Sequence, residues 1–200
     1  LVTSRIGTRP ENPPHRDPGH YLFRREVSRG GMLQWLGCHW IDVMLHVSGE
    51  PVTSVMAMTA RQTAENLEVD DTAACLMRFG NGMLGSLHVG YLLPTGQQTC
   101  LALRGSLGWV DWDGQQGRRF VVHSEHPSWA SAPTRVFDFP LPARADYGAG
   151  TGAALLQDFA RCVSQNGEQP AMTIDDCLAV LDVLDAAYES ADSGRAVALR

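Results

Sequence analysis

The segment "TAACLMRFGNGMLGSLHVGY", residues 72–91, decides the fold class. Apolar and polar side chains alternate on both sides of Gly80-Asn81-Gly82, which is the two-residue period of a β-strand. Asn-Gly readily adopts the positive φ values of a tight hairpin turn, so we predict antiparallel strands at 72–79 and 83–91. The parity expected to be buried contains Cys75, Met77, Phe79, Leu87, Val89 and Tyr91, and the other face contains Arg78, Ser86 and His88.

The other segments indicate further strands and three helices. Short strand candidates, separated by turn residues, lie at 2–7, 53–61, 100–104, 109–112, 120–124 and 135–139. Because strands joined by short links pair antiparallel, we predict an open, mainly antiparallel sheet. Helical apolar stripes lie at 31–47, 155–163 and 180–191, the last preceded by a capping-box sequence at 173–176. The expected fold is α+β, one domain over residues 1–200, with helices packed on one face of the sheet.

Composition excludes several classes of protein. The 200 residues carry 22 acidic and 16 basic side chains, a formal charge of −6, and no basic stripe, so we expect no nucleic-acid partner. No apolar run is long enough to span a membrane, and no leader pattern is visible. Five widely spaced cysteines without a CxxC pair predict reduced, mostly buried thiols and a cytoplasmic location. All 16 basic residues are arginine, which excludes a mechanism that uses a lysine of this chain.

The segment "GGMLQWLGCHWIDVMLHV", residues 30–47, gathers the candidate catalytic side chains. On a helix, Asp42 lies three residues after His39 and four before His46, and Trp35 lies four before His39, so all four project from one side. Leu33, Leu36, Val43 and Met44 are the expected apolar anchors of this helix. The polar row could bind a metal or perform acid–base chemistry, or its histidines could be hydrogen-bonded in a packed interface. The spacing leaves these alternatives open.

Two weaker motifs are expected to have no catalytic role. The run at 148–153 fits the dinucleotide pattern G-x-G-x-x-A, but no buried strand precedes it, so we predict a turn into a helix. The sequence His-Ser-Glu-His at 123–126 lacks a third spaced metal ligand, and we expect ordinary surface residues there. His15 and His20 lie in a proline-rich loop at 8–20 and are either solvated or part of a lid.

Four segments in order resemble the C-terminal domain of the Gfo/Idh/MocA family, the glucose–fructose oxidoreductase and inositol dehydrogenase family. They are "SRGGMLQWLGCHWIDVMLHVSGEPV", "VDDTAACLMRFGNGMLGSLHV", "LRGSLGWVDWDG" and "GEQPAMTIDDCLAVLDVLDAAYESADSGRAVAL", and they cover most of residues 28–199. The resemblance implies a two-domain parent that oxidises a sugar or polyol hydroxyl. An N-terminal Rossmann domain, expected to be absent from this chain, would bind NAD or NADP. This domain would contact the substrate and form a homodimer or larger oligomer through its open sheet.

The resemblance also assigns roles to residues. His39 matches the catalytic histidine of the family, and Asp42 matches its later aspartate. The earlier aspartate of the family falls on Trp35, whose indole can only donate one hydrogen bond and stack. The catalytic lysine of the family is part of a Glu-Lys-Pro element in the Rossmann domain. Residues 168–170 (Glu-Gln-Pro) resemble that element only superficially. The chain starts at Leu1, so we expect a fragment or processed product that binds no cofactor and is inactive alone.

The leading interpretation is a substrate-binding and oligomerisation domain. His39 would transfer a proton or orient the substrate, and the substrate pocket would be formed by Arg24, Arg29, Trp35 and Asp42. Tyr21, Phe23 and Arg24 fall where the family often has an aromatic–basic lip over the site. One alternative is a metal-assisted sugar lyase or hydrolase that uses His39, Asp42 and His46, although the leading interpretation assigns no metal. Another is a non-catalytic assembly module, with the polar face of the 72–91 hairpin in a wet dimer interface.

Overall fold

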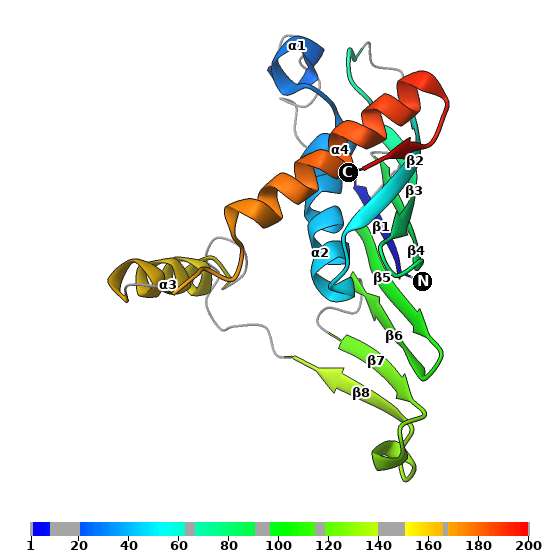
Figure 1. The fold of residues 1–200 in the computed structure, drawn as a ribbon, viewed down its shortest axis with the longest axis vertical. Coiled ribbons are helices and arrows are strands. Elements are labelled where there is room, and N and C mark those ends of the chain that lie inside the picture. The colour runs from blue at the N-terminus through cyan, green and yellow to red at the C-terminus, as the bar shows by residue number, and fades with distance from the viewer. Residues whose placement is uncertain are drawn as a thin grey trace.

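The computed structural model describes residues 2–8, 21–62, 67–90, 97–114, 119–139, 151–165 and 168–199. Within these residues, nine strands form one sheet, and α2 and α4 cover one of its faces (Figure 1). The strands are β1 (Val2–Thr8), β2 (Val52–Ala60), β3 (Thr72–Phe79), β4 (Leu84–Gly90), β5 (Gln97–Gly105), β6 (Gly108–Asp113), β7 (Arg119–Ser124), β8 (Thr134–Asp138) and β9 (Val197–Ala198). The helices are α1 (Arg25–Ser28), α2 (Cys38–Ser48), α3 (Thr151–Ser164) and α4 (Ile174–Ser193), with short turns η2 (Tyr21–Phe23), η3 (Leu33–Gly37) and η5 (Pro127–Trp129). The predicted α+β class is confirmed.

β3 and β4 form the predicted hairpin. The bounds of β3 are those predicted, and Cys75 lies opposite Leu87 across the ladder. Cys75 and Leu87 are buried, whereas Leu76 and His88, on the other parity, are exposed. The sheet therefore has one face in the core and one face outside, as the alternation predicted. Tyr91, the expected end of the second strand, lies outside the described residues.

The strand order departs from chain order at β1. The order is β8-β7-β6-β5-β1-β4-β3-β2-β9, with β1 parallel to β4 and antiparallel to β5. The other neighbouring strands are antiparallel, as predicted. A strand at 2–7 was predicted, but its place was not, because its partners lie far along the chain. The two-residue strand β9 was also not predicted.

The hydrophobic core lies between the sheet and the helices that cover it. Leu33, Ile41 and Met44 are almost completely buried. The sequence correctly predicted Leu33 and Met44, but it also predicted Leu36 and Val43, which are only half-buried, and it omitted Ile41. The difference arises because η3 is a π-helical turn, which holds more residues per turn than an α-helix and shifts the phase of the side chains that follow.

α3 does not follow the prediction that the helices pack on one face of the sheet. Figure 1 shows α3 standing away from the sheet, beyond the N-terminal end of α4. Its apolar stripe is solvent-exposed, with Leu156 at 70% and Val163 at 68%. The polar side of α3 holds the link to α4: Asp158 accepts the backbone N–H of Ala171 at 3.1 Å and pairs with Arg161. Polar contacts with that link therefore hold the helix in place.

α4 begins with the predicted capping box. Thr173 Oγ1 accepts the backbone N–H of Asp176 at 3.3 Å, and the Asp176 carboxylate accepts the Thr173 N–H at 2.7 Å. Gly194, at φ +67°, ends the helix in the left-handed conformation that glycine tolerates. Both ends of this helix were therefore predictable from local sequence.

The five cysteines are free, but the prediction that most are buried is wrong. Cys75 is buried, Cys177 is exposed, and the other three are half-buried. Cys75 lies in the core, and burial, reinforced by the charge of Asp70, raises the pKa of its thiol to about 12. No helix in the described part of the chain is both long enough and apolar enough to cross a membrane.

Candidate active-site helix

The helical segment that leads to His39 begins at a buried carboxylate. Asp70, between β2 and β3, is 9% exposed. Its Oδ1 accepts the N–H of Gly31 at 2.8 Å, its Oδ2 accepts that of Leu33 at 3.0 Å, and its carbonyl oxygen accepts that of Met32 at 2.9 Å. Helices leave their first four N–H groups without internal partners, and negative charge is favoured there. Asp70 therefore satisfies three successive donors at this helix start.

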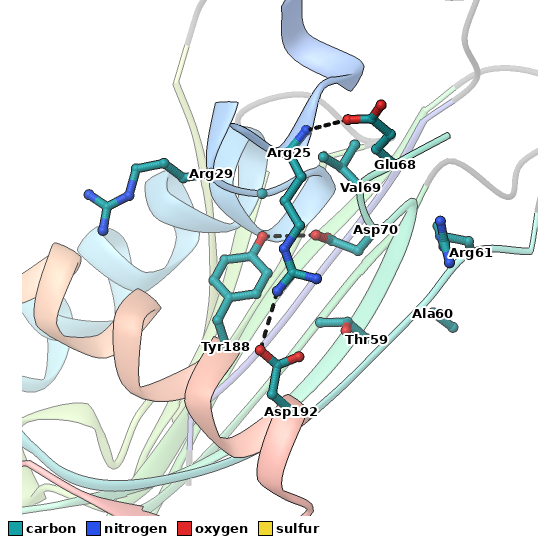
Figure 2. A pocket seen from close by; sticks show the side chains of 11 residues that line it. Arg25, Arg29, Thr59, Ala60, Arg61, Glu68, Val69, Asp70, Tyr188 and Asp192 are labelled. Atoms are coloured by element: carbon teal, nitrogen blue, oxygen red, sulfur yellow. Dashed lines mark hydrogen bonds and ion pairs between the residues drawn. The ribbon is translucent and has the colours of Figure 1, made fainter. Parts of the chain in front are cut away.

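Tyr188 of α4 completes this arrangement, which we call the Asp70 clamp (Asp70, Tyr188, Gly30 and Gly31). Its hydroxyl donates to Asp70 Oδ1 at 2.9 Å (Figure 2). Burial, together with the adjacent Asp70 charge, raises the pKa of the Tyr188 hydroxyl, so the phenol remains a neutral donor. The glycines allow the close approach, because a Cβ at Gly30 would lie 2.1 Å from the Tyr188 oxygen. The clamp thus joins the helix start, the β2–β3 connection and α4.

His39 lies on the exposed side of α2, after the π-helical turn η3. Within the described residues, no hydrogen bond joins its ring to another group, and none joins it to Asp42. Asp42 is half-buried, and burial raises the pKa of its carboxyl; His46 opposes this rise and Asp176 adds to it. The imidazole of His39 can therefore contact a group outside this domain.

Trp35 packs inside the domain rather than standing in an open polar row. Its ring lies 5.6 Å from that of Phe23, at 58°, in a small cluster with Leu67 and Val69. Its backbone N–H donates to the carbonyl oxygen of Gly31 at 2.9 Å, and its own carbonyl accepts the thiol of Cys38 at 3.4 Å. Trp35 is therefore connected to the Asp70 clamp on one side and to the residue before His39 on the other.

The predicted arginines lie around a different cavity. Arg29 lines a pocket of about 340 Å³ beside the Asp70 clamp and pairs with Asp185 at 3.4 Å. Arg25 lines the same pocket and pairs with Asp192 at 3.2 Å. Figure 2 shows Arg25, Arg29 and Arg61 pointing in different directions. This pocket therefore has no convergent cluster of cations that would bind an anion.

Arg24 and Asp42 are also separate from that cavity. Arg24 is an exposed side chain 3.7 Å from Glu26. Asp42 lines a second cavity of about 580 Å³, which is bounded by the C-terminal end of α2 and the start of α4 and also contains His46, Glu50 and Asp176. Among the described residues, Arg29 and Asp42 thus line different cavities, and neither of these two cavities is lined by Arg24, Trp35 or His39.

The histidine motifs of the sequence do not form a metal centre in the described part of the chain. Among the described residues, which include His39, Asp42 and His46, no three His, Cys, Asp or Glu side chains are grouped as metal ligands. His123 stacks on Trp109 and bonds Thr134 at 2.9 Å and Glu125 at 2.8 Å. His15, His20 and the glycines at 148–150 lie outside the described residues, and α3 begins at Thr151.

Sequence reasoning missed Asp70 and Tyr188. Two signals pointed toward them: the paired acids Asp70-Asp71 directly before a strand, and the paired glycines Gly30-Gly31 directly before a helix. Paired glycines indicate a close backbone approach, but not by which residue. The partner is 39 positions along the chain, so only the folded structure identifies it.

The fold and this helix define an α+β domain with an open sheet, and comparison with known proteins assigns it to a family. A model of the GFO/IDH/MocA C-terminal domain matches residues 2–111, slightly more than half of the chain. The chain therefore belongs to this family, as its four sequence segments predicted. No curated protein sequence matches the chain.

Three solved structures show the same fold. An oxidoreductase domain protein from Kribbella flavida has 18% identity and a TM-score of 0.83, covering 100% of this chain and 58% of its own. Levoglucosan dehydrogenase, in complex with NADH and levoglucosan, has 19% identity and a TM-score of 0.81, with the same coverage. GenD2 from gentamicin A biosynthesis, in complex with NAD, has 25% identity and a TM-score of 0.73, covering 100% of this chain and 55% of its own. The chain spans less than two thirds of each.

Proposed function

We propose that this chain is the C-terminal, substrate-facing domain of an NAD(P)-dependent enzyme that oxidises a hydroxyl group of a sugar or polyol. Family membership supports this proposal, and levoglucosan dehydrogenase and GenD2 are structurally similar proteins described with NADH and NAD. The observation that carries it is the position of His39, exposed on α2 with no ring hydrogen bond to the described residues. Its ring nitrogens are thus available to a substrate at the domain surface.

The cofactor would be held by another part of the parent protein. A dinucleotide site needs a glycine-rich turn between a buried strand and a helix, and the described residues contain no such unit. We therefore propose an N-terminal Rossmann domain as the NAD(P) partner of this chain. A nicotinamide bound there would supply the hydride acceptor for the substrate carbon.

In this proposal, His39 accepts the hydroxyl proton as the C–O bond becomes a carbonyl. A histidine is suited to this step because its ordinary pKa lies near neutrality. The ring of Trp35 would form an apolar wall next to the substrate, and Asp42, three residues after His39, would add negative charge near the imidazolium that forms. Arg24 and Arg29, which are exposed, would contribute only at the rim of the substrate site.

The test is a pair of histidine variants in the full-length protein. His39→Gln should lower kcat by about 10²- to 10⁴-fold, the usual contribution of general acid–base catalysis. His46→Gln, on the same helix and also exposed, should change kcat less than about threefold. Rates would be measured with NAD⁺ or NADP⁺ and a panel of hexoses, inositols and levoglucosan. Unchanged turnover in His39→Gln would rule out the proposed role, and micromolar NAD(H) binding by this chain alone would rule out the cofactor assignment.

We also propose that the open face of the sheet is a subunit interface. Met58 is 71% exposed and Leu76 is 62% exposed on this face, together with Met56 and Leu84. Met56 lies opposite Leu76 across β2 and β3, and Met58 follows Met56 on the same face of β2, so these three apolar side chains are contiguous. Contiguous exposed apolar surface of this kind commonly marks an interaction site.

Sedimentation of charge-insertion variants tests this interface. Leu76→Glu should convert the assembly to monomers, because a carboxylate would be buried in the contact. Leu107→Glu, on a similarly exposed leucine in the turn after β5, should leave the assembly intact. A wild-type protein that remains monomeric at high concentration would contradict the proposal.

A further inference from the structure

Two groups that the proposed reaction needs lie within a few residues of the Asp70 clamp. Trp35 donates its backbone N–H to Gly31, and Gly31 is held by Asp70 Oδ1. The carbonyl of Trp35 accepts the thiol of Cys38, the residue before His39. A series of hydrogen bonds therefore leads from the buried carboxylate to Cys38, the neighbour of the proposed catalytic residue His39.

The segment between the clamp and His39 is wound in an uncommon geometry. η3 is a π-helical turn, a rare geometry that often occurs as a single turn within an α-helix at functional sites and directs side chains differently from an α-helical turn. The far end of the segment is fixed, because Ile41 and Met44 are buried in the core. At the near end, Asp70 holds the N–H groups of Gly31, Met32 and Leu33. Releasing that end would let residues 31–37 rewind.

The side chain of Asp70 suits this task. It is buried, its two oxygens accept two backbone N–H groups and a phenol, and it lines the edge of the 340 Å³ pocket. Its neighbour Val69 packs in the cluster that contains Trp35. The same short connection therefore contacts the turn at its backbone and at the Trp35 ring.

We propose that Asp70 is a positioning residue. It fixes the conformation of the π-helical turn that contains Trp35 and precedes His39, and thereby holds the imidazole of His39 in reactive geometry with the substrate. The proposal rests on the proposed function of His39. A displacement of about 1 Å in an active site can lower a rate by about 10²-fold, so loss of the clamp should be visible in kinetics.

The experiment compares Asp70→Asn with Asp71→Asn in the full-length protein. An asparagine at 70 keeps one acceptor oxygen but turns an NH₂ group toward the other N–H donor. We expect kcat/KM for the best substrate of the sugar panel to fall by about 10- to 100-fold, while KM for NAD(P)⁺ changes less than about twofold. Asp71 is a matched control, because it is also buried but accepts the N–H of Gln62 instead. Asp71→Asn should lower the melting temperature without changing the kinetic constants at a temperature where it is folded.

A second measurement does not depend on activity. Hydrogen exchange of the amides in residues 31–39 should accelerate about tenfold or more in Asp70→Asn and stay unchanged in Asp71→Asn. Tyr188→Phe keeps the carboxylate and both N–H bonds, so it should lower kcat/KM by less than about threefold.

The outcomes separate this proposal from the proposed function. If His39→Gln abolishes turnover while folded Asp70→Asn keeps full kcat/KM and wild-type exchange, the positioning role is wrong. If Asp70→Asn and Asp71→Asn lower kcat/KM equally, the effect is general destabilisation and the role is also wrong. If His39→Gln is fully active, the proposed function fails, whereas accelerated exchange at 31–39 would still support the clamp itself.

Discussion

Gly31 has no side chain because backbone atoms of another segment occupy that space. A Cβ at Gly31 would lie 1.8 Å from the carbonyl oxygen of Asp70, and an oxygen of the backbone cannot swing away as a side chain can. At Gly49 the constraint is different, because φ is +64° but nothing lies within 4 Å of an added Cβ. Glycine is therefore required at Gly31 by close packing and at Gly49 by backbone conformation.

Gly31→Ala should lower the free energy of unfolding by about 3 kcal/mol or more, because the overpacked site can relax only by moving the β2–β3 connection. Gly49→Ala should cost about 1 kcal/mol, the usual penalty for an alanine in the left-handed region. Urea unfolding of both variants measures the difference. Equal costs at the two positions would show that Asp70 does not approach the helix start closely in solution.

At the scale of elements, α4 shows how a local signal fixes a helix end. Hydrogen bonds from Thr173, first from its backbone N–H and to a smaller extent from its hydroxyl, lower the pKa of the Asp176 carboxyl below its usual value of 3.8. Since the folded pKa is the lower one, the carboxylate contributes stability above the unfolded value, and this contribution is lost as the pH falls through the folded pKa. The helix start should therefore be acid-sensitive.

Asp176→Asn should reduce the loss of stability between neutral pH and the region below 3.8, because the variant has no carboxylate to protonate. Asp175→Asn, which removes an acid of the same first turn outside the capping box, is the matched control variant. Thr173→Ala should cost about 1 kcal/mol at neutral pH, the usual value for a lost helix cap. Thermal unfolding at a series of pH values checks all three, and identical pH profiles for the two aspartate variants would contradict the assignment.

At the scale of the whole molecule, the first described strand is central to the sheet. β1 pairs with both β4 and β5 and so joins the β2–β4 side of the sheet to the β5–β8 side. α3, in contrast, exposes its apolar stripe and is held mainly through its link to α4. A strand near the start of the chain is thus central in the sheet, whereas a helix within the chain has an exposed apolar face.

Hydrogen exchange should show this contrast directly. Amides of β1 should be among the most protected, because central strands open only when the sheet separates, and amides of α3 should be among the least protected. Exchange measured by mass spectrometry on the full-length protein distinguishes the two segments. Exchange of β1 on the timescale of α3 would mean that β1 does not hold the two sides of the sheet together.

The sequence by itself determined the elements whose signals are local. Alternating apolar residues and Asn81-Gly82 predicted the β3–β4 hairpin, and Thr173 with Asp176 predicted the start of α4. Family resemblance, also carried by sequence, selected His39. These features depend on side-chain periodicity or on groups within four residues of each other, so a linear pattern contains them.

Only the tertiary structure decided the position of β1, the π-helical turn η3, the detachment of α3 and the Asp70 clamp. It also separated Arg29 and Asp42 into different cavities, which a helical row could not reveal. For β1 and the Asp70 clamp the physical reason is the same: the deciding contact joins groups that lie far apart along the chain. Asp70 and Gly31 are 39 residues apart, and neither residue type predicts the other as its partner. Their hydrogen bond forms only once β2, β3 and α4 have folded together.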